Sequence, residues 1–402
     1  MKKLYILMIA LFLGNIVNAQ WVMQASFVTD ELTSVSFVDA NVGYTVGNGG
    51  VIMKTINGGT NWSYQTSGTT NDLISVCFKS INTGYAVGIY NTIQKTNDGG
   101  STWVSLNSGI SNSFYSVCFT DINTGYVVGD NGSIIKTTDG GTSWTVQNSG
   151  TTFELSSVFF VNANIGYIVG YENSLTYSVI LKTINGGSTW TILSSNYNCV
   201  LNSVYFTDEN TGFAVGRDGV MMKTINGGTT WVFLNTITTD PLRSVFFNDA
   251  NTGYVVGGTG ASSVISKTTN GGNSWTNQST YYYYQIRSVY FVNANIGYTV
   301  GHNGIIYKTT NGGGTGVSEV STNKIFTIYP NPATSNITLN LQQQTHLQNT
   351  KVSIYDIQGK LLLQQTIAQP QTELNIAHFA KGIYVIKVSN DKNNMVSKFV
   401  KE

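Results

Sequence analysis

Charged residues are scarce in this chain. Asp, Glu, Lys and Arg together make up 10% of its 402 residues, whereas roughly a quarter is typical of soluble domains. The formal net charge is +1, and Arg217, Arg243 and Arg287 are the only arginines. Without a basic field, nothing would attract nucleic acid or an anionic lipid surface. We therefore expect no nucleic-acid partner, and the composition suits an extracellular protein that recognises neutral polar groups.

Cysteine is also rare, and the three present, Cys77, Cys118 and Cys199, are too few for a disulfide framework. Cys77 and Cys118 both lie in Ser-Val-Cys-Phe, at the same place in two neighbouring repeats. We interpret them as small core residues. A strained disulfide or a metal pair is the alternative, although no histidine lies nearby in the sequence. We expect neither a bound metal nor a cofactor.

Only one long apolar run occurs, from Leu4 to Val17, directly after Lys2 and Lys3. Val17-Asn18-Ala19 resembles a small-residue cleavage site, so residues 1–19 are predicted to be a secretory signal peptide. Gln20, rather than a cysteine, follows the predicted cut, which argues against a lipid anchor there. No later stretch approaches the roughly 18 apolar residues of a spanning helix. We expect an exported protein without a transmembrane segment, either secreted or held at the cell surface.

What the chain has in abundance is repetition. Each repeat contains Ser-Val-x-Phe, Asp/Asn-x-Asn-x-Gly-Tyr-x-Val-Gly, Ile-x-Lys-Thr and Asn/Asp-Gly-Gly-x-Ser/Thr-Trp, with small departures between copies. A period near 40 residues with four short β-segments is typical of a propeller blade. The Ser-Val pairs begin at Ser34, Ser75, Ser116, Ser157, Ser203, Ser244 and Ser288, at spacings of 41, 41, 41, 46, 41 and 44 residues.

Residues 73–103 illustrate one repeat. Residues 73–78 alternate and are rich in strand formers, which predicts strand A. A turn that ends at Gly84 leads to strand B at 85–87, and 92–96 predict strand C. Trp103 is expected to start the outermost strand, D.

The loop before each tryptophan resembles the Asp-box, or BNR repeat, Ser/Thr-x-Asp/Asn-x-Gly-x-x-Trp. Its third residue is expected to accept hydrogen bonds from its own turn, and its indole to anchor strand D on a neighbouring blade. Asparagine replaces the acid in five of the seven copies, counting the degenerate Asn311, and one carboxylate per loop is too few for calcium. We therefore interpret these loops as structural, together with Asp39, Asp121, Asp208 and Asp249 of the A–B turns. The loop positions are Asn57, Asp98, Asp139, Asn185, Asn226 and Asn270, and the indoles are Trp62, Trp103, Trp144, Trp190, Trp231 and Trp275.

The seventh repeat lacks its tryptophan, because Asn311 is followed only by glycine and threonine up to Gly316. Trp21-Val22-Met23-Gln24 is an orphan D strand. If it pairs into the last blade, it closes the ring and removes an exposed sheet edge. The sequence therefore predicts an all-β fold: a seven-bladed β-propeller of four-stranded blades over residues 20–311.

Two repeats carry insertions between strands B and C, at 170–178 and 257–262. These B–C loops share a face with the D–A connections, and variable loops are where function concentrates. Arginines and aromatic residues on this face suit an acidic group, a sugar or a protein contact. The candidate ligand-binding residues are Arg217, Arg243, Arg287, Glu154, Glu172, Tyr171, Tyr177, Tyr281, Tyr282, Tyr283 and Tyr284. Burial of half of these tyrosines in strands, and solvated or locally paired arginines, are the alternative interpretations.

After a linker at 312–324 the repeats stop, and seven short predicted strands over 325–402 indicate a small Ig-like β-sandwich. This segment resembles the C-terminal sorting domain of type IX secretion substrates. The resemblance rests on Tyr329-Pro330-Asn331-Pro332, on residues 352–356 (Val-Ser-Ile-Tyr-Asp), on Gly359-Lys360, on residues 382–388 (Gly-Ile-Tyr-Val-Ile-Lys-Val), and on the terminal residues 398–402 (Lys-Phe-Val-Lys-Glu). It implies that the type IX machinery is a partner and that the domain is cleaved after export.

The repeats over about 20–312 resemble those of photosystem II assembly-factor-like proteins. That resemblance implies a propeller but leaves function open, and export argues against a photosystem role. We interpret the chain as a binding or adhesion module for a protein or an extracellular polysaccharide. The alternatives are a structural surface component and a glycosidase. A sialidase needs three arginines, a Tyr/Glu pair and an acid. Three arginines are present, but no Arg-Ile-Pro motif occurs, and nothing in the sequence pairs the acids Glu154, Glu172, Asp218 or Asp240. We therefore lean towards a protein that is not an enzyme.

Overall fold

A computed structural model describes residues 21–172, 174–260, 262–278, 284–314, 326–341, 350–356, 360–389 and 394–402. The predicted signal peptide, most of the predicted linker and Tyr281–Tyr283 lie outside these ranges. The chain divides into two compact units, Met1–Gly316 and Val317–Glu402. In the described ranges, no helix has the length and the apolar composition that crossing a membrane requires.

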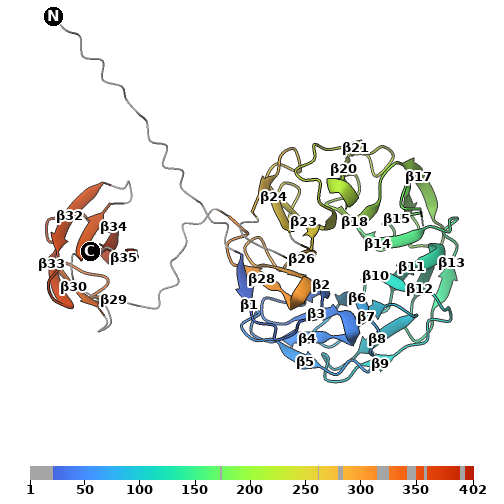
Figure 1. Cartoon of the computed structure of the whole chain (residues 1–402), viewed down its shortest axis with the longest axis horizontal. Coiled ribbons are helices and arrows are strands. Elements are labelled where there is room, and N and C mark those ends of the chain that lie inside the picture. The colour runs from blue at the N-terminus through green and yellow to red at the C-terminus, as the bar shows by residue number, and fades with distance from the viewer. Residues whose placement is uncertain are drawn as a thin grey trace, which may run out of the picture. The chain divides into compact units, whose positions relative to one another are not determined.

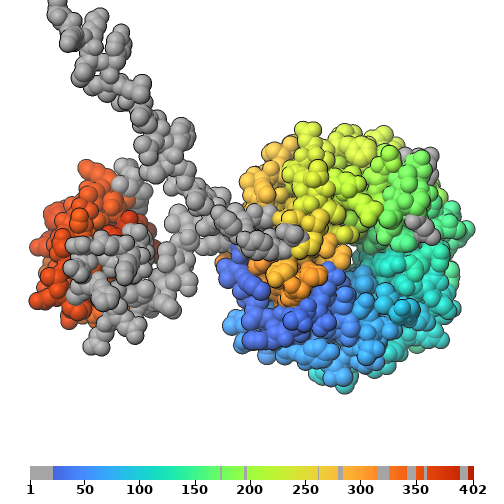
Figure 2. Space-filling model, viewed as in Figure 1, coloured from blue at the N-terminus to red at the C-terminus, as the bar shows by residue number. Residues whose placement is uncertain are grey.

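The first unit is built from seven antiparallel sheets of four strands each, which lie side by side around a central opening (Figures 1 and 2). The first strand of each sheet contacts the first strand of the next sheet, and β2 also contacts β26, so the ring is closed. Within a sheet the strands are called A to D from the centre outwards. In this order the sheets are β2 (Leu32–Phe37), β3 (Gly43–Gly47), β4 (Ile52–Thr55) and β5 (Ser63–Gln65); β6 (Leu73–Phe78), β7 (Gly84–Gly88), β8 (Thr92–Thr96) and β9 (Val104–Ser105); β10 (Phe114–Phe119), β11 (Gly125–Gly129), β12 (Ile134–Thr137) and β13 (Thr145–Gln147); β14 (Glu154–Phe160), β15 (Gly166–Tyr171), β16 (Ser178–Thr183) and β17 (Thr191–Tyr197); β18 (Leu201–Phe206), β19 (Gly212–Gly216), β20 (Met221–Thr224) and β21 (Val232–Phe233); β22 (Leu242–Phe247), β23 (Gly253–Thr259), β24 (Ser262–Thr268) and β25 (Thr276–Asn277); and β26 (Ile286–Phe291), β27 (Gly297–Gly301), β28 (Ile306–Thr309) and β1 (Val22–Gln24).

The last sheet contains both ends of the ring. β1 pairs with β28 in antiparallel register, Val22 opposite Lys308 and Gln24 opposite Ile306. Trp21, just before β1, is buried at 4% exposure among residues of β23 and β26. The predicted all-β propeller fold, with its N-terminal strand completing the last sheet, is confirmed.

One aromatic stack, repeated around the ring, joins neighbouring sheets. Phe78 at the end of β6 stacks on Tyr44 of the preceding sheet, with ring centroids 3.6 Å apart, and Trp103 meets the same phenyl ring edge-on at 5.9 Å. On its own sheet, the phenyl ring lies over Gly84, where an added Cβ would come within 2.4 Å of the ring. The Phe and Gly of the repeat are therefore required by one close contact, and burial of these rings is a main source of stability.

A polar contact reinforces each stack. The Tyr44 hydroxyl and the Lys54 ammonium both donate to the carbonyl oxygen of Gly99, at 2.8 and 2.6 Å. The same arrangement joins the last sheet to the first, because Tyr298 and Lys308 both donate to the carbonyl oxygen of Gly58. The Lys-Thr and Gly-Tyr motifs of the repeat thus hold the Asp-box loop of the next sheet, a role that the sequence analysis missed.

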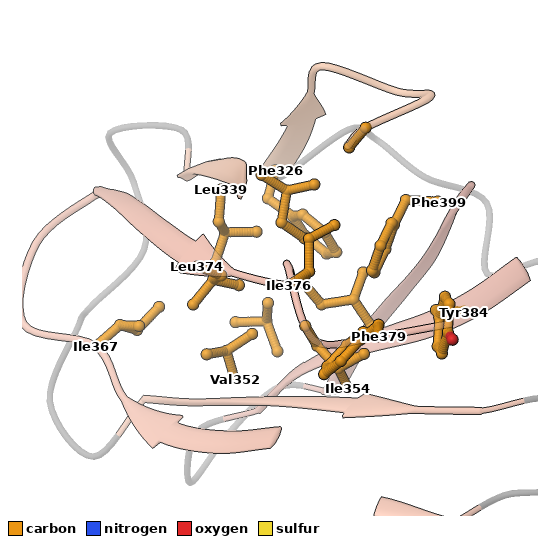
Figure 3. Packing of buried hydrophobic residues seen from close by; sticks show 14 of the residues in the cluster. Phe326, Leu339, Val352, Ile354, Ile367, Leu374, Ile376, Phe379, Tyr384 and Phe399 are labelled. Carbon is orange, nitrogen blue, oxygen red and sulfur yellow. The ribbon is translucent and has the colours of Figure 1, made fainter. Parts of the chain in front are cut away.

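The second unit consists of two antiparallel sheets. One is β29 (Phe326–Tyr329), β30 (Asn336–Leu341) and β33 (Gln371–Asn375), and the other is β32 (Leu361–Thr366), β31 (Lys351–Tyr355), β34 (Gly382–Ser389) and β35 (Asn394–Lys401). Alternate residues such as Leu339, Val352 and Ile386 fill one common core between the sheets (Figure 3). The Ig-like topology stays a prediction.

Candidate functional site

The B–C loops and the D–A connections lie on one face of the ring, here called the B–C face. The amide of Asn48 in a B–C loop donates to the carbonyl of Glu31 in a D–A connection, and a Cβ on Gly47 would come within 2.1 Å of that oxygen. On the opposite face, the amide of Gly58 in an Asp-box donates to the carbonyl of Asn41 in an A–B turn. The B–C loops and D–A connections thus lie on one face of the ring, and the A–B turns and Asp-box loops lie on the other.

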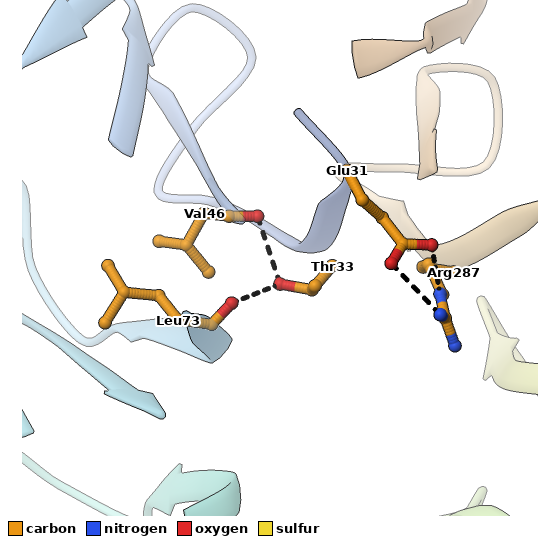
Figure 4. Close-up of polar contacts among 5 residues, drawn as sticks. All are labelled: Glu31, Thr33, Val46, Leu73 and Arg287. Atoms are coloured by element: carbon orange, nitrogen blue, oxygen red, sulfur yellow. Dashed lines mark hydrogen bonds and ion pairs between the residues drawn. The ribbon is translucent and has the colours of Figure 1, made fainter. Parts of the chain in front are cut away.

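The side chains near the centre of the B–C face come from one position of the repeat. In the first sheet this position is the second residue of strand A, and each other sheet has an equivalent residue. These residues are Thr33, Ile74, Tyr115, Ser156, Asn202, Arg243 and Arg287. Short polar side chains there join neighbouring sheets: the Thr33 hydroxyl donates to the carbonyl of Leu73 at 2.6 Å (Figure 4), and Ser156 bonds to Leu201 in the same way at 2.8 Å.

Arg287 joins the last sheet to the first. Its Nε lies 2.6 Å from Oε1 of Glu31 and its Nη2 lies 3.0 Å from Oε2 (Figure 4). This bidentate geometry is the strong form of an arginine–carboxylate contact. In the described part of the chain it is the one salt bridge, so Arg287 is largely neutralised by its neighbour.

Arg243 occupies the same position one sheet earlier and is half-buried. Its Nε is shielded from solvent and has no hydrogen-bond partner among the described residues. Burial lowers the pKa of its guanidinium, and the charges of Arg287 and Arg217 lower it further. Arg217 is exposed at the start of η3 (Arg217–Gly219), in the B–C loop of the preceding sheet. The structure therefore brings all three predicted arginines together, with one carboxylate, Glu31, paired among them.

Tyr171 is close to Glu154 and to two of the arginines, Arg243 and Arg217. Glu154 is its cross-strand partner. The pKa of Tyr171 is raised to about 12, first by burial and then by the charge and a hydrogen bond of Glu154. The charges of Arg243 and Arg217 act in the opposite direction. Beyond Glu154, the Tyr115 hydroxyl donates to Asp130. The pair of Tyr171 with Glu154 and the pair of Tyr115 with Asp130 are both outside the recognised repeat motif. Tyr115 lies in β10 and Asp130 directly follows β11, the neighbouring strand of the same sheet, but they come close to Glu154 only when adjacent sheets pack, and the sequence did not indicate this.

The other predicted residues of the B–C face are less closely grouped. Glu172 accepts a hydrogen bond from Ser174 within its own loop. Tyr177 is 42% exposed and Tyr284 is 38% exposed. The ring of Tyr284 faces His302 at 6.2 Å. Tyr281, Tyr282 and Tyr283 lie outside the described residues.

The Asp-box loops bind their own backbone. Asp98 accepts hydrogen bonds from the amide and hydroxyl of Thr102 and from the hydroxyl of Thr96, at 2.9, 2.6 and 2.8 Å. The Thr102 bonds, followed by the Thr96 bond, hold the pKa of Asp98 at about 2. In the copies with asparagine, Asn185 accepts from the amide of Thr189 and donates to its hydroxyl, so the loop keeps its geometry without a charge.

Metal ligands do not gather in the described ranges: no cluster of three or more His, Cys, Asp or Glu side chains could hold an ion there. The three cysteines are free thiols. Cys77 and Cys118 occupy equivalent positions in β6 and β10, and burial raises the pKa of both, to about 12 for Cys118. Such thiols are poor nucleophiles.

Comparison with known proteins agrees with this architecture. Residues 14–108, 103–199 and 188–279 match the model of the family described as photosynthesis system II assembly factor YCF48, and residues 327–402 match a secretion system C-terminal sorting domain. No curated protein sequence matches the chain. The sorting domain indicates export, to the cell surface or beyond it.

Solved structures similar to this chain are propellers. YCF48 bound to D1 peptide is 18% identical with a TM-score of 0.62, covering 72% of this chain and 95% of that one. YCF48 from Cyanidioschyzon merolae is 17% identical with a TM-score of 0.61, covering 72% and 98%. The WD40 propeller domain of Doa1 is 13% identical with a TM-score of 0.59, covering 72% and 96%. At these identities the likeness establishes the fold, and together with the family match it shows that the chain belongs to the YCF48 family and carries a secretion sorting domain at its C-terminal end.

Proposed function

We propose that this exported propeller is a binding module whose arginine cluster, Arg217, Arg243 and Arg287, takes an acidic group of a protein partner. The observation that carries the proposal is the environment of Arg243. Its side chain is half-buried, and its Nε is shielded from solvent without an acceptor among the described residues. A shielded N–H group without an acceptor is costly, and an incoming carboxylate would relieve that cost by a bidentate contact with Nε and an Nη group.

The charges near Arg243 support an anionic ligand. Arg217 and Arg287 are the neighbouring charges that lower its pKa, and Glu31 is the carboxylate that opposes them. Since Glu31 is already engaged by Arg287, a positive excess is left at Arg217 and Arg243. In a chain with so little charge, this excess is a local feature that an acidic partner would recognise.

A protein is the favoured kind of partner. One of the similar propellers, YCF48, was solved with a D1 peptide bound, so a fold of this kind accommodates a peptide. The B–C face also presents Tyr177 and Tyr284 partly exposed, and tyrosine and arginine are the residues that dominate protein-binding energetics.

The test is a titration of fluorescent peptides that end in Asp or Glu, with amidated and all-neutral versions as controls, against the full exported chain. Binding of the acidic peptides should weaken at least tenfold in Arg243→Gln. Lys79→Gln, which removes an exposed charge from the A–B turn of the opposite face, should bind as the unaltered protein does. Equal affinity of Arg243→Gln and the unaltered protein would remove the proposal.

Hydrolysis of a carboxylated sugar is a second candidate, because the structure brings Glu154 and Tyr171 together beside Arg217 and Arg243. Three arginines next to a Tyr/Glu pair are what a sialidase-type reaction requires. The raised pKa of Tyr171, about 12, makes its phenolate hard to form and weighs against this activity. Turnover of a fluorogenic sialoside that disappears in Glu154→Gln would establish it, and a complete absence of turnover would rule it out.

A further inference from the structure

Two bulky side chains on the B–C face sit at positions where other sheets have glycine, asparagine or aspartate. Phe27 has φ +60° and Tyr90 has φ +53°, a left-handed backbone that is rare and strained for large residues. Neither side chain gains packing in return, because Phe27 is 90% exposed and Tyr90 is 69% exposed.

Phe27 occupies a turn that recurs in the D–A connections. The hydroxyl of Ser26 bonds to the carbonyl of Val28 across it, as Ser67 does to Thr69 in the next connection. The central residue of that second turn is Gly68, at φ +77°. Phenylalanine therefore replaces the residue type that the turn favours.

Tyr90 occupies the tight B–C loop of the second sheet. The amide of Thr92 closes this loop on the carbonyl of Ile89, as Ser133 does on Asp130 in the third sheet. The residue equivalent to Tyr90 there is Asn131, at φ +53°, and asparagine tolerates this conformation far better than tyrosine. Each position therefore costs about 1 kcal/mol or more of backbone strain, although both aromatic rings are exposed to solvent.

Two shallow hollows border the loop that carries Tyr90. Asn71 of the first hollow donates to Thr92, and the carbonyl of Asn112 in the second hollow accepts from the amide of Asn91. The first, of about 540 Å³, is lined by Tyr64 and residues 66–71 along β5 and the connection to β6. The second, of about 460 Å³, is lined by Val146, Gln147, Asn148 and neighbouring polar residues two sheets further on. Both lie within residues 21–172, which are described without a gap, and no charged side chain lines either one.

The first hollow combines an aromatic platform with free hydroxyls. Tyr64 is 57% exposed. The side chains of Thr66 and Thr70 are exposed and can each donate and accept a hydrogen bond. A pyranose ring has C–H groups that pack on an aromatic face and hydroxyls at its edge that pair with such groups. A charged ligand would find no counter-charge in either hollow.

We propose that the arc formed by Phe27, Tyr64, Tyr90 and the two hollows is a second binding site, for an extended neutral polysaccharide. Its repeating sugars would occupy successive hollows and stack on the exposed rings between them. Tyr64, Tyr90 and the two hollows belong to the first three sheets, whereas the arginines belong to the fifth, sixth and seventh sheets; Phe27 lies in the connection between the seventh and first sheets, which also carries Glu31. Tyr64 and Tyr90, the residues that the test changes, are therefore separate from the proposed acidic-partner site.

The experiment is affinity gel electrophoresis of the full exported chain in soluble β-glucan, α-glucan, mannan and xylan, with polygalacturonate as the acidic control. At least one neutral polymer should retard the protein, and the apparent affinity should fall at least tenfold in Tyr64→Ala and in Tyr90→Gly. Phe233→Ala removes an exposed ring at the position of strand D equivalent to Tyr64, in the fifth sheet, and should be retarded as strongly as the unaltered protein.

Folding defects do not confuse the result, because Tyr90→Gly and Phe27→Gly relieve a strained φ and should keep or raise the melting temperature. Failure of every neutral polymer to retard the protein would overturn the proposal. So would retardation that Tyr64→Ala, Tyr90→Gly and Phe233→Ala all leave unchanged, or retardation by polygalacturonate alone.

Discussion

Trp21 packs edge-on against Phe291, with ring centroids 5.8 Å apart and planes at 85°. The same contact joins Trp62 to Phe37 at 6.0 Å and 88° in the first sheet. A tryptophan at the start of the ring thus supplies the contact that the last repeat lacks. Closure of the propeller depends on a residue that is distant in sequence from the sheet it completes.

Trp21→Ala should cost about 3–5 kcal/mol of unfolding free energy, as expected for loss of a large buried ring. Thermal or denaturant unfolding of the propeller measures this loss, with Val22→Ala, a 58% exposed side chain of the same strand, as the matched control. A melting temperature of Trp21→Ala equal to that of Val22→Ala would contradict closure by this residue.

The tyrosine contact between sheets can be tested in both directions. Tyr298 donates to the carbonyl of Gly58. The equivalent residue in the fifth sheet is Phe213, which has no hydroxyl, and the carbonyl of Gly271 accepts from Lys223 there. Tyr298→Phe should destabilise the protein by about 1 kcal/mol and Phe213→Tyr should stabilise it by a similar amount. Chemical denaturation checks both; a loss of stability in each variant would show that ring packing, rather than the hydroxyl, decides.

The acid sensitivity of the ring should reside partly in Asp98 and Asp139. Both have folded-state pKa values near 2, below the usual 3.8, because of hydrogen bonds from Thr102 and Ser143 first. The unfolded chain therefore binds more protons between about pH 4 and pH 2, and stability falls as the pH falls through this range. The variant with Asp98→Asn and Asp139→Asn should lose less stability over that interval. Melting curves at several acidic pH values test this, and parallel pH profiles would contradict it.

Glu31 competes with any acidic partner for Arg287. Glu31→Gln removes that carboxylate, so acidic peptides should bind about threefold more tightly, the size expected for a partly exposed ion pair. The matched control is Asp72→Asn, which removes the same charge from the equivalent position of the next sheet, where the carboxylate accepts from the amide of Gly49. Weaker binding in Glu31→Gln would mean that Glu31 orients the arginine rather than competing for it.

The repeats predicted the local structure well because each strand is specified by its own residues: the segments expected for 73–78 and 92–96 coincide with β6 and β8. Trp21 was identifiable because the last copy lacks an indole. The pairing of Arg287 with Glu31 was not, since these residues lie at opposite ends of the ring sequence and meet only on closure. The positive φ of Phe27 and Tyr90 was also missed. From the sequence alone, an aromatic residue in place of glycine or asparagine suggests that the loop has changed its conformation, whereas the structure shows that the backbone conformation is kept.

The arginine composition allows a direct test of the central claim. All three arginines of the chain are in the cluster, so phenylglyoxal, which modifies guanidinium groups, reports on this site alone. We expect modification of Arg217 and Arg243, located by mass spectrometry, to abolish binding of an acidic peptide, and bound peptide to protect both residues. Undiminished binding by protein modified at all three arginines would contradict the account.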